Sequence, residues 1–586
     1  MLSAGNMNLP GLSKHSMART DARLSCRCIC MPSHSHDDVC WSKISILHLS
    51  LALVFFFARC SFAQNPTPAS DWTTWGYDQE RTGWNRGETS LTTHNVSGLR
   101  LLWSAQLSTP PKPIVLSTLT SPLVAEGVST AQGAKNLVFL LGADDTVFAL
   151  DADTGRVFWQ KTFANPAAPI WPGTWLCSNT VNDTPVIDKQ NKIIFLITSD
   201  GKLRGLNLSD GADRMTPVSM VEPYARAWSL NLIDNVLYTT SGRGCGQLPA
   251  VAGVKPSVVP GSVSAMDVSD LAHPRLTRFY TSGNKYSGPW GRGGVARGPD
   301  GTVITQTADG FYDPAAGDFG ETVLKLAPKA TRLLDSFTPS NWQFLNAKDL
   351  DLGSATSDVF TFQNRTLIAV AGKEGFLYVL DAADLGGRPS HSTPLYKSPQ
   401  LGNDTAEGRN PGQGAWGAIT TYETPDHKRF LYVPIWGPPA KNAPQFKSTS
   451  GAAPHGSIMA FQVVADGEKV SLEPEWISHD MSVPDPPVVA NGVLYAMQTG
   501  EQTIQSPAYV HGTQDEINHN PLSAKYRSTP INNLILFAFD AETGKQLYSS
   551  EGIITDWVHF SEPVVALDKV FVVTHDAHIY AFGLQR

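Results

Sequence analysis

Three short segments of the chain place tryptophan directly before an apolar strand, where its side chain could meet a ligand. They are GPWGRGG, with Trp290 and Arg292, GAWGA, with Trp416, and DWVHFSEP, with Trp557 and His559. Packing in the core is the alternative for each tryptophan. Arg292 is harder to explain in that way, because an unpaired buried charge is costly. Arg292 and Trp416 are therefore candidates for binding a ligand.

Two groups of residues have the chemistry of metal ligands. THDAHIYAF brings His575, Asp576 and His578 together, although a polar hairpin turn explains this spacing more simply. CRCIC, Cys40 and Cys60 all lie before residue 64, in a segment that we expect to be removed. No CxxCH occurs, which argues against covalently attached haem.

The segment SKISILHLSLALVFFFARCSFAQ is typical of a secretory signal. Lys43 precedes an apolar run over residues 44–58, and the small residues Ser61 and Ala63 form a cleavage site before Gln64. A membrane anchor is the alternative, but the run is shorter than the roughly 20 residues that a spanning helix needs. A lipoprotein signal does not fit, since FFAR precedes the cysteine. We therefore expect an N-terminal extension and signal, residues 1–63, and one periplasmic or secreted domain, residues 64–586.

The mature chain would keep two cysteines, Cys177 and Cys245. An even pair in an exported protein favours a disulfide, with two free thiols as the alternative. The net charge of -8 is mild and spread out, and no long basic or acidic run occurs. Binding to nucleic acid therefore has no support in the composition.

A strand–turn–strand phrase recurs along the mature chain. VFLLGADDTVFALDADTGRVFW, IAVAGKEGFLYVLDAADLGG and LILFAFDAETGKQLY are clear copies. About eight units can be recognised, and they open near Ser121, Asn182, Ser229, Gly294, Gly353, Gly417, Pro486 and Ser561. Units of four short antiparallel strands, repeated in this way, predict an all-β fold, an eight-bladed β-propeller.

Parts of the phrase have structural roles. In the turn Asp151–Gly155, the Asp and Thr side chains bind local backbone and Gly closes the hairpin. Trp159 should pack between adjacent blades. The last unit lacks an outer strand, so we expect LRLLWSAQL, residues 99–107, to complete it and remove an exposed edge. Two polar, Pro-rich insertions, after Trp436 and Thr499, predict surface loops, one or both capping a face of the ring.

AxDxxTGxxxW within an eight-bladed propeller resembles the pyrroloquinoline-quinone (PQQ) repeat of the quinoprotein alcohol dehydrogenases. DWTTWGYDQERTGWN and VSGLRLLW also resemble the start of those enzymes. LDLGSA and GKEGFLYVLD are similar to the polyvinyl-alcohol-dehydrogenase-like branch. The same repeat builds non-catalytic scaffolds in the outer-membrane assembly machinery, so the resemblance speaks to fold more than to activity.

The resemblance implies roles for particular residues. In the family a Trp stacks on the quinone, an Asp acts as base, and an Arg or Lys binds the quinone oxygens. Trp228, in AWSLNLIDNVLYTTSGR, occupies the stacking slot. Asp351, in KDLDLGSA, occupies the base slot, and Lys373, in AGKEGFLYVLD, occupies the cation slot about 22 residues later. A hairpin aspartate and an ordinary turn lysine are the alternatives.

The family's metal slots are altered in this chain. Arg243 stands where the family has an Asn ligand, and Asp200, also a turn residue of the repeat, falls near the slot of a Glu ligand. Ca²⁺ binds six to eight oxygens, and a guanidinium would repel it. Either Arg243 takes over the role of a cation or the metal site has been lost. The resemblance therefore implies PQQ as the cofactor, whereas the altered slots make Ca²⁺ a doubtful one.

These observations predict an exported quinoprotein-like oxidoreductase that oxidises a small alcohol, polyol or sugar with PQQ in the central channel. A periplasmic electron acceptor is a possible partner, and no membrane span remains after signal cleavage. Two alternatives stay open. One is a PQQ-repeat propeller that serves as a binding or assembly scaffold, and the other is a calcium- or carbohydrate-binding surface domain.

Overall fold

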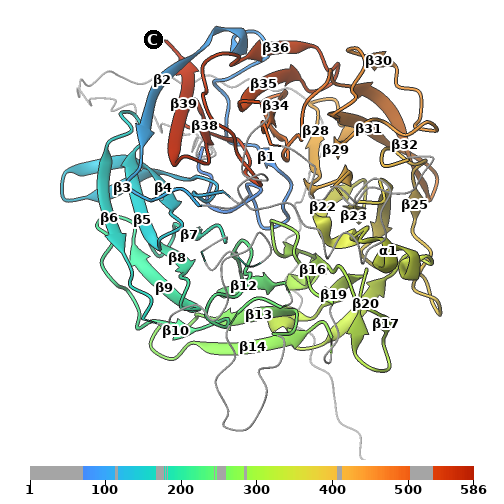
Figure 1. The fold of residues 1–586 in the computed structure, drawn as a ribbon, viewed down its shortest axis with the longest axis horizontal. Coiled ribbons are helices and arrows are strands. Elements are labelled where there is room, and N and C mark those ends of the chain that lie inside the picture. Colours follow the sequence, from blue (N-terminus) through green and yellow to red (C-terminus); the bar gives the residue numbers. More distant parts are fainter. Residues whose placement is uncertain are drawn as a thin grey trace, which may run out of the picture. The chain divides into compact units, whose positions relative to one another are not determined.

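The computed structural model describes residues 70–112, 117–166, 177, 180, 183–242, 244–246, 259–282, 287–404, 412–501 and 532–585. They belong to one compact unit, Asn65–Arg586, which is distinct from Met1–Gln64. Within this unit, small antiparallel sheets follow one another around a ring (Figure 1). Eight of these sheets are blades of a β-propeller built from the described residues, so the predicted fold class is confirmed.

The blades are numbered in chain order, each from its innermost strand outwards. Blade 1 holds β3 (Leu123–Thr130), β4 (Gly133–Leu141), β5 (Thr146–Asp151) and β6 (Val157–Thr162). Blade 2 holds β7 (Val186–Asp188), β8 (Ile193–Ile197), β9 (Lys202–Asn207) and β10 (Val218–Ser219). Blade 3 holds β11 (Asn231–Ile233), β12 (Val236–Ser241), β13 (Ser262–Asp267) and β14 (Arg275–Tyr280). Blade 4 holds β15 (Ala296–Arg297), β16 (Val303–Gln306), β19 (Val323–Leu326) and β20 (Leu333–Phe337).

The second half of the ring continues the pattern with added short strands. Blade 5 holds β22 (Asp358–Phe362), β23 (Arg365–Ala371), β24 (Leu377–Asp381) and β25 (Tyr396–Lys397). Blade 6 holds β28 (Thr420–Glu423), β29 (Arg429–Trp436), β31 (Gly456–Asp466) and β32 (Lys469–Ile477), with β26 (Gly414–Ala415) and β30 (Ser448–Thr449) added. Blade 7 holds β33 (Val488–Ala490), β34 (Val493–Gln498), β35 (Ile535–Asp540) and β36 (Gln546–Ser549), with β1 (Trp84–Asn85) added. Blade 8 holds β37 (Val564–Ala566), β38 (Lys569–Val573), β39 (His578–Leu584) and β2 (Leu99–Gln106).

A few elements lie between these strands. The hairpin of β17 (Tyr312–Asp313) and β18 (Asp318–Phe319) extends blade 4, and β21 (Ala355–Thr356) pairs with β27 (Gly417–Ala418). In the described part of the chain, α1 (Trp342–Lys348) is the one α-helix, beside four 3-10 turns, η1 (Val96–Gly98), η2 (Pro299–Gly301), η3 (Pro328–Ala330) and η4 (Leu352–Ser354). No helix in these residues is long and apolar enough to cross a membrane.

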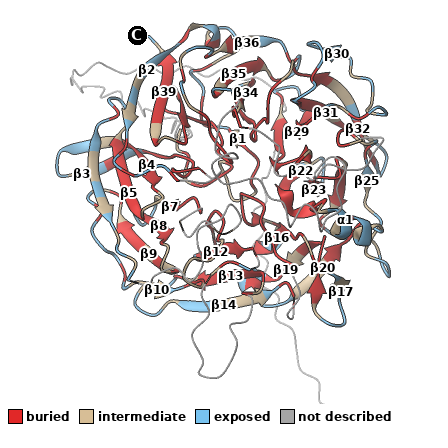
Figure 2. Ribbon diagram, viewed as in Figure 1, coloured by how far each residue is buried: buried red, intermediate tan, exposed pale blue. Residues whose placement is uncertain are grey.

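The ring closes as the sequence predicts. β2, from the N-terminal part of the domain, pairs antiparallel with β39 from Leu99↔Leu584 to Gln106↔His578. β1 adds a second tie, because it runs parallel to β33 of blade 7. Figure 2 shows the result, with buried strands towards the centre and exposed positions at the rim.

The repeated turn locks each blade to its neighbour. Asp151 Oδ1 accepts hydrogen bonds from the backbone N–H and the hydroxyl of Thr154, both at 3.1 Å. Trp103 of blade 8 packs over this turn and donates its indole N–H to Ala152 O at 3.1 Å. Trp159 of blade 1 makes the same contact with Leu208 O of blade 2 at 2.9 Å. The predicted inter-blade packing of Trp159 is therefore confirmed.

The two insertions have different outcomes. After Trp436, the insertion of blade 6 returns β30 to the outer edge, where it runs parallel to β32. The insertion after Thr499 lies outside the described residues except at its start.

A pair of glycine substitutions tests the turn-over-tryptophan packing. A Cβ added at Gly544, whose φ is 72°, would lie 2.5 Å from Trp476, whereas Gly552, whose φ is 76°, has nothing within 4 Å of such an atom. Both substitutions carry the cost of positive φ, but only Gly544→Ala also overpacks the inter-blade contact. We expect Gly544→Ala to lower the free energy of unfolding by at least about 1 kcal/mol more than Gly552→Ala, measured by urea denaturation. Equal losses would contradict the packing role of the turn.

Candidate functional site

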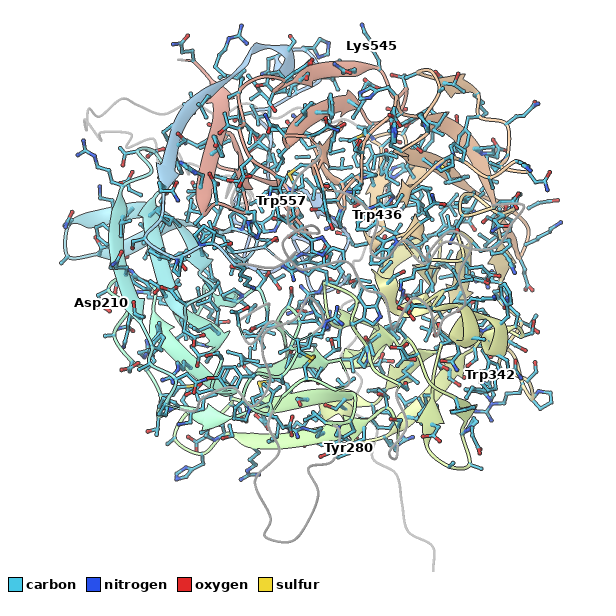
Figure 3. All side chains as sticks on the ribbon, in the orientation of Figure 1. Asp210, Tyr280, Trp342, Trp436, Lys545 and Trp557 are labelled. Atoms are coloured by element: carbon cyan, nitrogen blue, oxygen red, sulfur yellow. A yellow bond between two sulfur atoms is a disulfide. The ribbon has the colours of Figure 1, made fainter. Side chains whose placement is uncertain are left out.

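Loops from several blades bring aromatic side chains together near the centre of the ring. We call this group the axial aromatic cluster; its members are Trp228, Trp290, Ala308, Trp416, Trp436, Val483 and Phe560. The rings of Trp416 and Trp436 stack with centroids 4.4 Å apart and planes at 4°. Trp290 meets Trp416 edge-on at 5.4 Å. Figure 3 shows Trp436 near the centre, whereas Trp342 lies at the rim. The predicted Trp228, Trp290 and Trp416 are thus brought together.

One lysine lies between this cluster and a group of carboxylates. Lys373 Nζ lies 2.7 Å from Asp351 Oδ2 and 3.5 Å from Asp349 Oδ1. The same atom lies 5.0 Å from the ring centroid of Trp416 and 5.3 Å from that of Trp290. The ammonium is therefore attracted both by the two carboxylates, through ion pairing, and by the two indole rings, through cation–π interaction. The structure brings Asp351 and Lys373 into direct contact.

Backbone geometry holds this pair in place. The helix α1 ends at Lys348, and the next residue, Asp349, adopts the left-handed conformation with φ 56° and ψ 39°. Asp351 then precedes η4, and its carbonyl accepts the backbone N–H of Lys373 at 3.1 Å. Asn403 Nδ2 donates to the carbonyl of Lys373 at 2.6 Å. Asp351 and Lys373 are therefore held by main-chain contacts as well as by their side chains.

Two further acids complete a carboxylate cluster, which we define as Asp309, Asp349, Asp351 and Glu321. One oxygen each from Asp309, Asp349 and Asp351 lies within 4.8 Å of the others. Glu321 is fully buried and accepts the backbone N–H groups of Asp309 and Leu352, both at 2.7 Å. Glu321 thereby ties the hairpin of blade 4 to the segment that leads into blade 5.

Crowding in the cluster changes its protonation. Desolvation and then repulsion from Asp351 raise the pKa of Glu321 well above its usual range. Desolvation raises the pKa of Asp349 to about 7, although the attraction of Lys373 opposes the shift. Near neutral pH, the cluster therefore carries fewer negative charges than its four carboxyl groups would have in water.

Arg292 contributes a second buried cation to the axial aromatic cluster. Its side chain is 4% exposed, and its guanidinium carbon lies 5.4 Å from the ring centroid of Trp228. Nε and Nη1 have no hydrogen-bond partner among the described residues. Desolvation lowers the pKa of Arg292 to about 10, against the attraction of Asp485 and Asp183. Buried donors without partners are costly, so this guanidinium suits an anionic ligand.

The tryptophans divide between the two cations. Trp228 is fully buried and lies beneath Arg292 and Arg226, with the carbon of the Arg226 guanidinium 5.0 Å from its ring centroid. Trp290 and Trp416 instead flank Lys373. The aromatic faces beside the predicted base are therefore those of Trp290 and Trp416.

The other predicted site residues have separate outcomes. Asp200 accepts hydrogen bonds from Arg204 at 2.8 Å and Thr198 at 2.6 Å, both in its own hairpin, and the structure does not bring it to the carboxylate cluster. Arg243 lies outside the described residues. Cys177 and Cys245 are joined in a disulfide.

The histidine-containing segments of blade 8 have local partners. Asp576 accepts a hydrogen bond from Thr574 Oγ1 at 2.6 Å and lies 2.8 Å from His578 Nδ1, as expected of a polar hairpin turn. Trp557 stacks on His575 with centroids 4.4 Å apart. His559 pairs with the buried Glu501.

Sequence reasoning missed three of the four carboxylates. Asp309 has the place and the positive φ, 54°, of an ordinary turn residue of the repeat. Asp349 stands two residues before Asp351 in KDLDLGSA, so this pair of aspartates could have indicated a second carboxylate in the site. Glu321 follows a hairpin that departs from the repeat, and nothing local in the sequence indicates its contacts.

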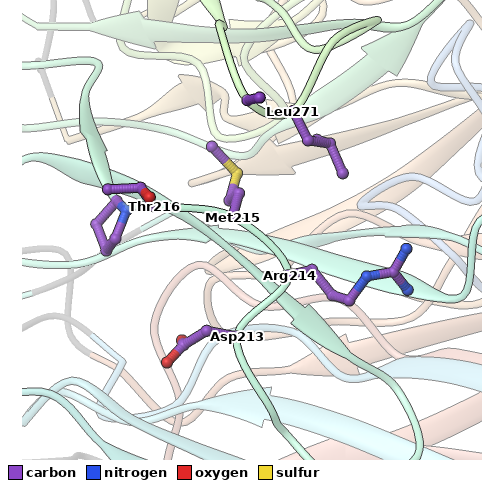
Figure 4. A pocket seen from close by; sticks show the side chains of 7 residues that line it. Asp213, Arg214, Met215, Thr216 and Leu271 are labelled. Carbon is purple, nitrogen blue, oxygen red and sulfur yellow. The ribbon is translucent and has the colours of Figure 1, made fainter.

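A separate hollow of about 700 Å³ lies on the outer part of blades 2 and 3 (Figure 4). It is lined by residues 213–217, Leu271 and Ala272. The side chains of Asp213 and Arg214 extend away from each other there. This hollow gathers no group of facing charges comparable with that of the axial site, which we define as the axial aromatic cluster, Arg292, Lys373 and the carboxylate cluster.

The comparisons with known proteins agree with this architecture. A family model described as "Outer membrane protein assembly factor BamB" matches residues 80–243. The quinohemoprotein alcohol dehydrogenase of Comamonas testosteroni is 14% identical, with a TM-score of 0.53, over 88% of this chain and 81% of that one. A europium-containing methanol dehydrogenase is 13% identical, with a TM-score of 0.54, over 88% and 98% of the two chains. No curated protein sequence matches the chain.

These similarities define the class of fold. The chain resembles the PQQ-repeat quinoprotein dehydrogenases and shares their eight-bladed propeller. At such low identity the likeness establishes the fold alone, and the activity has to be argued from the axial site.

The raised pKa of Asp349 predicts a pH dependence of stability. Because this pKa is raised from 3.8 to about 7, the folded protein holds a proton that the unfolded chain has lost across that window. The contribution of Asp349 to the free energy of unfolding therefore falls as pH rises from about 4 to about 7. Asp349→Asn should remove this part of the slope, measured by urea unfolding at several pH values.

Asp270→Asn is the matched control, because Asp270 is exposed and its pKa is lowered rather than raised. It should leave the downward slope in place. A slope unchanged in Asp349→Asn would contradict the assignment.

Proposed function

We propose that the protein is a quinone-dependent oxidoreductase that oxidises an alcohol, polyol or sugar at the axial site. One observation carries the proposal. Asp351 is 3% exposed, its Oδ2 is held by Lys373 at 2.7 Å, and its Oδ1 has no hydrogen-bond partner among the described residues. A buried, oriented carboxylate with an unused oxygen is suited to accept the proton of a substrate hydroxyl.

Residues of the axial site fit PQQ, a flat quinone that carries carboxylates. Trp290 and Trp416 supply aromatic faces, and the unpartnered N–H groups of Arg292 supply donors for an anion. When bound, the quinone would accept the electrons that leave the substrate carbon. Trp290, Trp416 and Arg292 would therefore hold the cofactor.

Residues of the chain would accept and position the proton of the substrate hydroxyl. Lys373 would hold Asp351 in one orientation before the transfer, and its charge would stabilise negative charge that develops on the substrate oxygen. The axial aromatic cluster keeps water away, which strengthens these electrostatic contacts. This division of labour follows from the contacts of Lys373 with both the carboxylates and the indoles.

Asp351→Asn tests the assignment of the base. The purified mature chain would be mixed with PQQ, with and without Ca²⁺, and dye reduction would be followed with a panel of alcohols, polyols and sugars. We expect Asp351→Asn to lose about 100-fold or more in kcat, since a general base contributes at least that much, while quinone binding persists. Asp270→Asn, at an exposed carboxylate, is the control and should keep full activity. Full turnover in folded Asp351→Asn would remove this residue from the mechanism.

A second candidate function is a binding or assembly scaffold. It is favoured by the match of residues 80–243 to the family described as an outer membrane protein assembly factor. The two functions separate on cofactor binding, because a scaffold has no need of a quinone. Absence of PQQ binding at micromolar concentrations would favour the scaffold.

We also propose that the domain is exported after cleavage between Ala63 and Gln64. The support is the order of Lys43, the apolar run of residues 44–58 and the small residues that follow. The intact mass of the chain recovered from the periplasm or medium of a Gram-negative host should correspond to a start at Gln64. A mass that retains residues 44–58 would contradict the proposal.

A further inference from the structure

We propose that Lys373 is the built-in cation of the carboxylate cluster, and that its ammonium takes the place a divalent metal ion would need. The inference concerns the site of the proposed function, and its consequence for turnover rests on that function. The occupancy of the cluster by the lysine can be tested without any quinone.

The first argument is geometric. Lys373 Nζ is within 2.7 Å of Asp351 and 3.5 Å of Asp349, and one oxygen each from Asp309, Asp349 and Asp351 lies within 4.8 Å of the others. Ca²⁺ binds oxygens at about 2.3–2.6 Å, so an ion shared by Asp349 and Asp351 would have to lie where the ammonium lies or directly beside it. Two positive charges at that separation repel strongly in a desolvated site. The residues present therefore do not fit a metal while the lysine stays.

The second argument is that the lysine is held in place. Its side chain is 6% exposed, and the ring centroids of Trp416 and Trp290 are 5.0 and 5.3 Å from Nζ. Its backbone N–H and carbonyl are bound by Asp351 and Asn403. A surface lysine could swing away to admit a metal, whereas this one is buried between indole and carboxylate partners.

The third argument is how the acids of the cluster are already partnered. Both oxygens of Glu321 accept backbone N–H groups, from Asp309 and Leu352, each at 2.7 Å. The ammonium of Lys373 instead faces the carboxylates of Asp349 and Asp351. Asp351 Oδ1 is buried without a hydrogen-bond partner in the described part of the chain, so a carboxylate oxygen stays available within the cluster.

A chemical consequence follows. The positive charge that orients the base and stabilises a developing alkoxide is carried by a side chain, so it cannot be removed by a chelator. Replacing the ammonium with a neutral group of similar size should vacate the cluster and expose carboxylates to solution cations. The chain would then hold a metal site that the natural residue suppresses.

Terbium luminescence tests this directly, because Trp290 and Trp416 lie beside the cluster and can sensitise a bound Tb³⁺ ion. The proteins compared are the wild type, Asp309→Asn, Lys373→Met, Lys373→Met with Asp309→Asn, Lys373→Arg and Lys329→Met. Lys329 pairs with Asp267 at 2.8 Å on the exposed surface and is the matched control. We expect Lys373→Met to bind one Tb³⁺ ion per chain with a saturable signal and an affinity at least 10-fold higher than that of the wild type. Adding Asp309→Asn to this variant should weaken the binding again.

The outcomes decide the proposal. A saturable Tb³⁺ site in the wild type that is lost in Asp309→Asn would overturn it, as would a folded Lys373→Met that binds no Tb³⁺. If Lys373→Met does not fold, the wild type and Asp309→Asn decide alone: identical, unsaturable signals support the proposal, and a difference refutes it. Lys373→Arg, which keeps the charge, should bind no Tb³⁺.

A separate measurement distinguishes this inference from the proposed function. If PQQ binds the wild type, its absorbance should remain after dialysis against EDTA, and loss on chelation would overturn the inference while leaving the proposed function intact. If no PQQ binds, the proposed function fails, and the terbium comparison still judges the role of Lys373.

Discussion

The antiparallel pairing of β2 with β39 is the constraint on which the axial site depends. A strand from the start of the domain completes the last blade as its outermost strand and so joins the two ends of the ring. Once the ring is closed, the loops before the innermost strands are held around one centre. Trp228, Trp290, Trp416 and Phe560 come from four such loops and meet in one cluster. The contacts of the site are therefore long-range contacts that only a closed ring can maintain.

The centre of the ring concentrates charge in a place poor in water. Arg292 and Lys373 are both nearly buried, each against an aromatic face, and each with carboxylates near it. Such an arrangement stabilises the fold poorly, because desolvation of charges costs more than isolated pairs return. It is favourable for function, because fixed charges act strongly on a ligand in a desolvated site. The two cations are separated, with Arg292 beside Trp228 and Lys373 beside Trp290 and Trp416.

The fold could be predicted from the sequence because it depends on local patterns that recur in each repeat. The turn at Asp151 and the tryptophan at position 159 interact with backbone within or next to their own unit, so their roles follow from spacing. Asp351 and Lys373 were also identified from the sequence, through slots that the family resemblance implies, although their direct contact was not predicted. Asp309 and Glu321 could not be identified in this way. Their roles depend on where the blade 4 hairpin meets the segment after α1, and that contact between blades leaves no pattern in either segment.

Native mass spectrometry of the mature chain with PQQ in a metal-free volatile buffer tests the central claim most directly, since it reports the cofactor and any metal ion in one mass. The account predicts one PQQ per chain, with no added mass of a divalent ion, and weaker retention of PQQ in Arg292→Ala. Absence of a PQQ adduct, or an adduct that forms only together with Ca²⁺, would contradict it.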